Sequence, residues 1–98
     1  MENMFMILGK IKEIEKQGEE RKKIILTIGV SRSFKNVDGE YDIDDVKCTL
    51  WGGIGENTLE YCKKGDTIAV KGRIQVIENE IELVAEKLSF LSIKEENK

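Results

Sequence analysis

The chain has 98 residues, a formal net charge of −3, two cysteines and no histidine. This length allows one domain with a modest core, and the lack of histidine removes the usual general base and the commonest metal ligand. The negative charge disfavours a nucleic-acid partner, because neutralising phosphates supplies most of the affinity for DNA. The charge is unevenly distributed, however: residues 21–35 carry five cations and no acid, whereas acids gather in residues 38–45 and from Glu78 onward.

Neither a signal peptide nor a membrane span is expected at the N-terminus. The apolar stretch from Met4 to Leu8 is short, and neither a basic leader nor a cleavage site flanks it. Cys48 and Cys62 lack the clustered cysteine or histidine partners of a zinc site. We therefore expect a cytoplasmic protein with reduced, structural cysteines and no cofactor.

Segments rich in Ile, Val, Leu and Thr, separated by polar turns with glycine, predict an all-β domain. Two turns are marked, one over residues 16–19 and one over Asn36–Glu40, where Asp-Gly supplies the positive φ of a hairpin tip. In chain order, the expected strands are Met4–Glu15, Arg21–Ser33, Val46–Gly52, Asp66–Val76 and Ile81–Phe90.

One segment, Glu56–Lys64, has a helical pattern, with Ile54, Thr58 and Tyr61 on one side and Gly65 as C-cap. Five strands with a short helix between the third and fourth are the plan of the OB-fold barrel. We expect an OB-fold domain over residues 1–92 and a short, charged, disordered tail over residues 93–98.

The third strand contains the only tryptophan. Alternation puts Val46, Cys48 and Leu50 on one face and Lys47, Thr49 and Trp51 on the other. An exposed indole beside a lysine is a platform on which a nucleobase can stack. A tryptophan that packs under a loop or in a subunit interface is also compatible with this pattern.

The fourth strand shows a similar division between its two faces. Ile68, Val70, Gly72 and Ile74 are expected to point inward, and Lys71, Arg73 and Gln75 outward. Such a basic row can track a phosphate backbone, or it can be an ordinary solvated face.

The order of these segments resembles the bacterial single-stranded DNA-binding (SSB) proteins over nearly the whole chain. NMFMILGKI from Asn3 resembles the opening strand of that family, and LTIGVSRSFKNVDGE from Leu26 resembles its second strand and hairpin. Further similar pieces are CTLW from Cys48, EYCKKG from Glu60 and VKGRIQ from Val70. The resemblance implies an OB-fold that binds single-stranded DNA and has no catalytic residues.

The resemblance also implies which residues would contact DNA. Phe34 and Trp51 stand where family members place stacking aromatics, and Tyr61 is expected to plug the barrel instead. With the neighbouring cations, the expected nucleic-acid-binding residues are Lys10, Arg32, Phe34, Lys35, Lys47, Trp51, Lys71 and Arg73.

Three departures from the family pattern predict a shorter and weaker DNA path. Asp45 stands where the family commonly has a stacking aromatic, and Gly52-Gly53 replaces basic or polar residues. The hairpin Ile77–Glu80 is short, where the family usually has a longer loop with another aromatic. We expect no acidic tail tip of the kind the family carries, and therefore no recruitment of repair enzymes through one.

Two other motifs are set aside. Gly52-Gly53-Ile54-Gly55 superficially resembles a dinucleotide-binding loop, but the basic, alternating strand that follows does not fit a βαβ unit. The acids of residues 38–45 match no metal-binding loop, so we expect a solvated acidic hairpin and no metal site.

The sequence thus predicts sequence-tolerant binding of single-stranded DNA, in replication, recombination or repair. The alternative is an SSB-like OB domain used as a protein-interaction or primosome-type assembly module that binds DNA weakly. A homo-oligomer is also expected, tetramer rather than dimer, because Asn3–Ile11 is apolar on both faces and needs a partner subunit to cover it.

Overall fold

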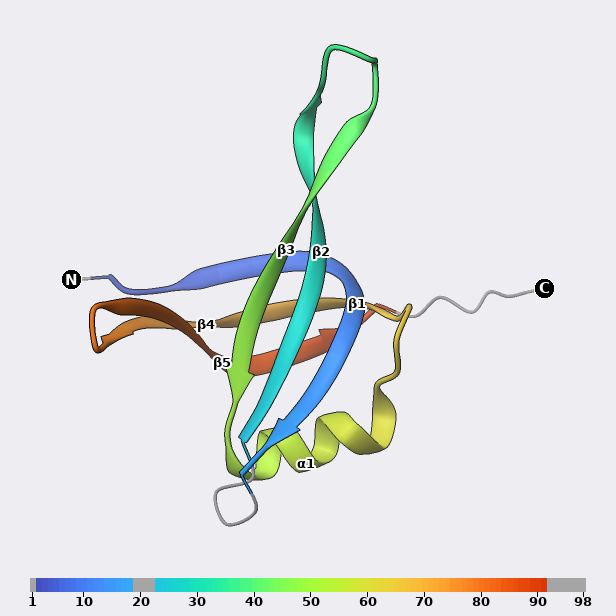
Figure 1. Ribbon diagram of the computed structural model, residues 1–98. Coiled ribbons are helices and arrows are strands. Elements are labelled where there is room, and N and C mark those ends of the chain that lie inside the picture. Colours follow the sequence, from blue (N-terminus) through green and yellow to red (C-terminus); the bar gives the residue numbers. More distant parts are fainter. Residues whose placement is uncertain (1, 19–22, 92–98) are drawn as a thin grey trace.

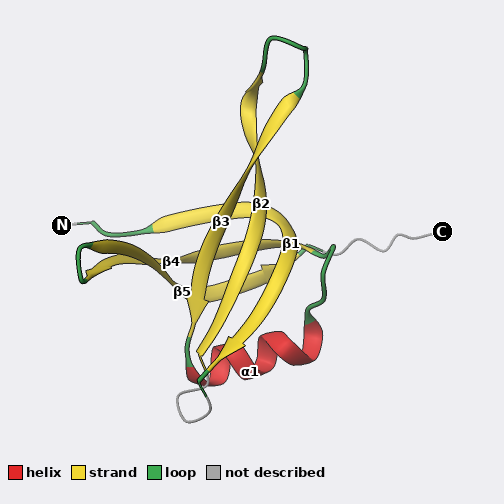
Figure 2. Cartoon of the chain, viewed as in Figure 1, coloured by secondary structure: helices red, strands yellow, loops and turns green. Residues whose placement is uncertain are grey.

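The computed structural model describes residues 2–18 and 23–91 and contains a closed five-stranded barrel. The elements are β1 (Phe5–Gln17), β2 (Lys23–Lys35), β3 (Tyr41–Leu50), α1 (Gly52–Tyr61), β4 (Thr67–Ile77) and β5 (Glu80–Phe90). Around the barrel the strands follow the order β1-β2-β3-β5-β4, and α1 lies across one end (Figure 1; Figure 2). This arrangement confirms the predicted OB-fold with its helix between the third and fourth strands.

The core forms because each strand alternates apolar and polar residues. In β2, Ile24, Leu26 and Ile28 are buried, while the residues between them face outward and are partly exposed. The barrel closes where β3 meets β5 in parallel at Thr49 and Val84. There is no room for a side chain at Gly72 of β4, because a Cβ atom there would overlap the carbonyl oxygen of Val84.

Strands β2 and β3 extend past the barrel as a projecting hairpin, which we call the arm (residues 31–45; Figure 1). The Asn36 side chain shapes its tip by accepting hydrogen bonds from the backbone N–H groups of Asp38 and Glu40, each at 2.9 Å. Gly39 has a φ of 80°. The predicted hairpin tip over residues 36–40 is confirmed.

A two-residue turn joins β4 to β5. Glu78 and Asn79 have φ values of 52° and 67°, both in the left-handed region, as the tight turns of two-residue hairpins require. The short hairpin expected from the sequence is therefore present, and residues 74–83 form a second, shorter projection.

Several expected boundaries are wrong. Strand β3 begins at Tyr41, five residues before the predicted Val46, because it pairs with β2 along the arm. Strand β1 runs to Gln17 and so includes the first two residues of the turn predicted over residues 16–19. The last residue of that turn, and the tail expected over residues 93–98, lie outside the described residues. Helix α1 covers Gly52–Tyr61 instead of Glu56–Lys64.

Tyr61 does not plug the barrel. It is 70% exposed, whereas Thr58 is buried and Ile54 packs against the core. The helix starts earlier than predicted, which places Tyr61 in its last turn, and Cys62 rather than Gly65 is the C-cap. Ile74, expected to point inward, is 38% exposed because β4 continues past the closed part of the barrel.

Among the described residues, no helix has the length and apolar character that crossing a membrane requires.

Candidate nucleic-acid interface

A groove lies between the outer faces of β2 and β3 and the β4–β5 hairpin. Its volume is about 390 Å³. Strand alternation turns Lys23 and Ile25 of β2, and Lys47 and Thr49 of β3, toward this groove. The hairpin forms the opposite wall with Ile77, Glu78, Glu80, Ile81, Glu82 and Leu83. The outer β2–β3 face and this hairpin are the surfaces that OB-folds use for oligonucleotides.

Trp51 lies directly after β3, beside the groove, as the N-cap of α1. The indole is half-buried, and the Nζ atom of Lys23 lies 5.3 Å from the centroid of its ring. This is cation–π distance. A cationic side chain therefore lies over the ring face, and a nucleobase would reach that face only by displacing Lys23.

The arm carries three of the expected site residues, and one of them is largely neutralised. Arg32 donates two hydrogen bonds to the carboxylate of Asp44, at 3.0 and 3.1 Å, and lies 3.8 Å from Asp42. The hydrogen bond from Arg32 lowers the pKa of Asp44, so the pair stays charged near neutral pH.

The other two arm residues keep exposed surface. Phe34 is 65% exposed, and the Nζ atom of Lys35 lies 5.9 Å from the ring centroid of Tyr41. Phe34 is thus available for stacking, in the place where the resemblance puts a stacking aromatic.

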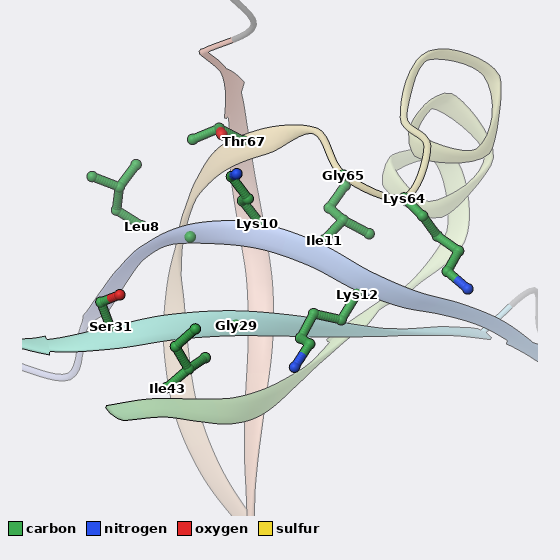
Figure 3. A pocket seen from close by; sticks show the side chains of 11 residues that line it. Leu8, Lys10, Ile11, Lys12, Gly29, Ser31, Ile43, Lys64, Gly65 and Thr67 are labelled. Carbon is green, nitrogen blue, oxygen red and sulfur yellow. The ribbon is translucent and has the colours of Figure 1, made fainter. Parts of the chain in front are cut away.

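Lys10 lies in a separate basin at the base of the arm (Figure 3). This basin measures about 720 Å³ and combines the apolar side chains of Leu8 and Ile43 with Lys10, Lys12 and Lys64. The Nζ atom of Lys12 lies 3.1 Å from the carboxylate oxygen Oδ1 of Asp45, on the outer face of β3.

Lys64 also has an acidic partner, Glu13, at 3.9 Å. No carboxylate among the described residues forms an ion pair with Lys10. Lys10 is therefore the one basin lysine whose charge no described acid offsets.

Lys71 and Arg73 lie on another side of the barrel. Lys71 is on the outer face of β4 between Met6 of β1 and Lys87 of β5, its direct partners in the sheet. Arg73 is held by Glu86 at 3.0 Å. The basic row read from the fourth strand therefore does not line the groove.

The structure brings together only part of the predicted site. Lys47 lines the groove, and Trp51 adjoins it through its contact with Lys23. Arg32, Phe34 and Lys35 lie on the arm, and the remaining cations lie elsewhere on the barrel. The prediction missed Lys23, Thr49 and the hairpin isoleucines Ile77 and Ile81. The pairing of β2 with β3 would have indicated Lys23. Ile24 pairs with Leu50, so in this antiparallel ladder the preceding residue, Lys23, lies opposite Trp51.

The two cysteines have thiol groups of low reactivity. Burial raises the pKa of Cys48 to about 11, and burial together with the charge of Asp66 raises the pKa of Cys62 to about 11. At neutral pH both are thiols, which are poor nucleophiles and poor ligands. Within the described part of the chain, no three His, Cys, Asp or Glu residues form a group that could hold a metal ion.

Comparison with known proteins agrees with this geometry. The model of the Single-strand binding protein family matches residues 2–91. Single-stranded DNA-binding protein B of Bacillus subtilis is 43% identical in an alignment of 82 positions that covers 74% of this chain and 73% of that protein.

Two solved structures share the fold. The mitochondrial single-stranded DNA-binding protein Rim1 of S. cerevisiae superposes with a TM-score of 0.69 at 20% identity, covering 93% of this chain and 96% of that one. The N-terminal domain of PriB from Thermoanaerobacter tencongensis, a dimeric structure, gives a TM-score of 0.63 at 14% identity, covering 91% and 96%.

Proposed function

The chain belongs to the single-strand binding protein family, and on this premise we propose that it binds single-stranded DNA in a sequence-tolerant way and catalyses no reaction. The observation that carries the proposal is the groove lined by Lys23 and Lys47, together with the half-buried indole of Trp51 that Lys23 contacts. Stacking on an aromatic ring needs unpaired bases, and lysines attract phosphates whatever the sequence. The role we propose is in replication, recombination or repair, in the cytoplasm.

The DNA path we propose starts at the groove and continues to the arm. Trp51 and Phe34 would each stack a base, while Lys47, Lys35 and Lys10 would follow the backbone. Arg32 and Arg73 contribute less than the sequence suggested, because carboxylates of Asp44 and Glu86 already hold them. Lys71 would contact DNA only where a longer strand passes around the barrel.

We also propose a closed homo-oligomer, a tetramer rather than a dimer. Met4, just before β1, is 55% exposed, and Met6 and Leu8 on the outer side of β1 are 67% and 56% exposed. From Phe5 to Gly9 this strand pairs only with β4, since its pairing with β2 begins at Lys10. An apolar strand with an open edge favours association, and a second copy would cover both the edge and the face.

The binding proposal is tested with oligo-dT and a duplex of equal length. We expect oligo-dT to bind more tightly, with affinity that falls steeply as salt rises, because bound lysines release condensed counterions. Equal affinity for single strands and duplex would contradict stacking on Trp51 and Phe34.

The second candidate, a protein-interaction or assembly module that binds DNA weakly, is favoured by one set of contacts. Four cations of the described residues are paired with carboxylates, in the pairs Arg32–Asp44, Lys12–Asp45, Arg73–Glu86 and Lys64–Glu13. Fluorescence distinguishes the two functions, because oligo-dT should quench Trp51 emission only if bases stack on the indole. A flat salt response with no quenching would favour the interaction module.

A further inference from the structure

The basin at the base of the arm lies in a fork between two strands. From Lys10 onward β1 pairs with β2, whereas before Lys10 it pairs with β4 alone. One edge of β1 is therefore open from Phe5 to Gly9, and β2 continues without β1 from Val30 into the arm. The basin is the angle of this fork, with Leu8 and Lys10 on one side and Ser31 on the other (Figure 3).

The lining of the basin is aliphatic and cationic. Leu8 and Ile43 are 56% and 57% exposed, and Gly29 between them adds no side chain. Lys10 forms no ion pair with a described acid. None of the described residues that line the basin is aromatic, so it offers no ring on which a nucleobase could stack. The lining fits a short extended segment that carries an apolar side chain and a carboxylate.

The residues just before β1 are such a segment. Glu2 and Met4 are exposed, and Glu2 forms no ion pair with a described residue. Between them, the side-chain amide of Asn3 donates to the carbonyl oxygen of Ile74 and accepts from its N–H group, each at 2.8 Å. These bonds hold the segment beside β4, in line with β1, where alternation places Glu2 and Met4 on the outer side.

A second copy on the open edge of β1 would bring this segment to the basin. A two-fold contact is self-complementary, so an antiparallel pair of β1 strands that uses the whole open edge is centred on Ile7. Lys10 then lies opposite the partner's Met4, and the partner's Glu2 is its diagonal neighbour. Because β2 occupies the edge of β1 from Lys10 onward, the partner's segment cannot continue the ladder. It passes over Gly29 into the basin instead.

We infer that the basin receives residues 2–4 of a second copy, with the partner's Met4 on Leu8 and Ile43 and the partner's Glu2 paired with Lys10. This inference rests on the assembly proposed above, and it adds residues of the partner to the site. Two-fold symmetry forms the contact twice in each pair of copies. In the assembled protein, a DNA phosphate then competes with the partner's Glu2 for Lys10.

The first test exchanges the charges of Glu2 and Lys10 in the full chain. Glu2→Lys and Lys10→Glu each bring like charges together. Each should weaken association at least about five-fold, because the pair is lost twice and two exposed ion pairs together give about that factor. The double variant Glu2→Lys/Lys10→Glu restores opposite charges and should associate within about two-fold of the parent. Sedimentation equilibrium at micromolar protein gives the association constants.

The second test asks whether the partner reaches the arm side of the basin. Ile43 belongs to β3, so pairing between β1 strands alone would not need its side chain. Ile43→Ser removes apolar surface on which the partner's Met4 would lie, and it should weaken association at least about three-fold. A thermal melt of each variant checks that the barrel is folded.

Two matched controls should associate like the parent. Glu60→Lys makes the same charge change as Glu2→Lys on the exposed side of α1, and Val37→Ser removes an exposed apolar side chain at the tip of the arm.

The outcomes separate the basin contact from the assembly. A charge exchange that fails to restore association, or an Ile43→Ser protein that associates like the parent, would overturn the basin contact and leave the assembly standing. Weaker binding of oligo-dT by Ile43→Ser with unchanged association would assign the basin to DNA instead. A parent that stays monomeric would refute the assembly, and the basin contact would fail with it.

Discussion

Trp51 is the N-cap of α1 and also part of the binding surface that we propose. It follows the last buried residue of β3, so the core holds its backbone while its ring stays half-buried under Lys23. A single lysine over a half-exposed ring contributes little to stability, so exchanging this contact for a stacked base would cost little.

We expect Trp51→Ala to weaken binding of oligo-dT by about 1–3 kcal/mol, the usual contribution of one stacked base. The fold should persist, because Trp51 is not among the buried core residues. Tyr61→Ala, which removes an exposed aromatic ring from α1, is the control and should leave affinity unchanged. Binding titration with a thermal melt checks both, and an unfolded Trp51→Ala protein would assign the indole to the core.

The thiols should resist alkylation. With a pKa of about 11 for both Cys48 and Cys62, on the order of one thiol in a thousand is ionised at pH 8. Iodoacetamide should therefore label the native protein very slowly at pH 8, and faster as the pH rises toward 11. Mass spectrometry measures the labelling, and the same protein in urea, where both thiols react, is the control. Rapid labelling of the native protein at pH 8 would show that the thiols are not buried.

At the scale of elements, the arm and the basin at its base depend on ion pairs between neighbouring strands. Lys12 of β1 reaches over β2 to Asp45 of β3, at the base of the arm. Both side chains of the pair are about half exposed, so the ion pair contributes little to stability. It does, however, neutralise the charge of Lys12, which could otherwise bind a DNA phosphate.

Asp45→Asn should strengthen binding of single strands and steepen its salt dependence. The substitution releases Lys12 and removes a carboxylate that repels phosphates, and one added phosphate contact changes the slope of log K against log salt by about 0.7. Titrations at several salt concentrations measure the slope. Glu60→Gln, with the same charge change on α1, should alter it less. Unchanged affinity and slope would place Asp45 off the DNA path.

Close packing of β4 on β5 depends on the absence of a side chain at Gly72. Gly72→Ala would push a methyl group into the carbonyl of Val84, and overpacking of this kind costs about 1–3 kcal/mol. The midpoint of urea unfolding should fall accordingly. Gly53→Ala is the control, since no atom lies within 4 Å of its Cβ position and alanine favours the first turn of α1. An equal midpoint in both variants would show that β4 can move away from β5.

For the whole molecule, the exposed side of β1 determines the assembly we propose. The chain is acidic overall, with a net charge of −3, yet the outer positions of β1 from Met4 to Lys10 carry no acid. Copies can therefore approach along this strand without repulsion between carboxylates.

Met6→Glu should shift the oligomer toward monomer, because it places a charge within the apolar face that a second copy would cover. Sedimentation equilibrium at micromolar protein measures the mass. Val37→Glu is the control, since Val37 is fully exposed at the tip of the arm and should leave the mass unchanged. A parent protein that stays monomeric at this concentration would refute the assembly.

The sequence alone determined the elements and the faces of each strand. Alternation and turn residues are local properties, so the five strands, the helix after the third and the tight hairpins at Asn36–Glu40 and Glu78–Asn79 could be predicted. The outward direction of Lys47 and the family of the chain followed from the same local order.

Only the tertiary structure decided what covers each face. Alternation tells which side of a strand a residue occupies, but not where that strand lies around the barrel or what packs on it. For this reason Lys71 lies away from the groove, Asp44 holds Arg32, and the outward Thr49 is buried under the hairpin. Tyr61 is exposed for a related reason, since the position at which α1 begins sets which of its residues face the barrel, and the end of β3 sets that position.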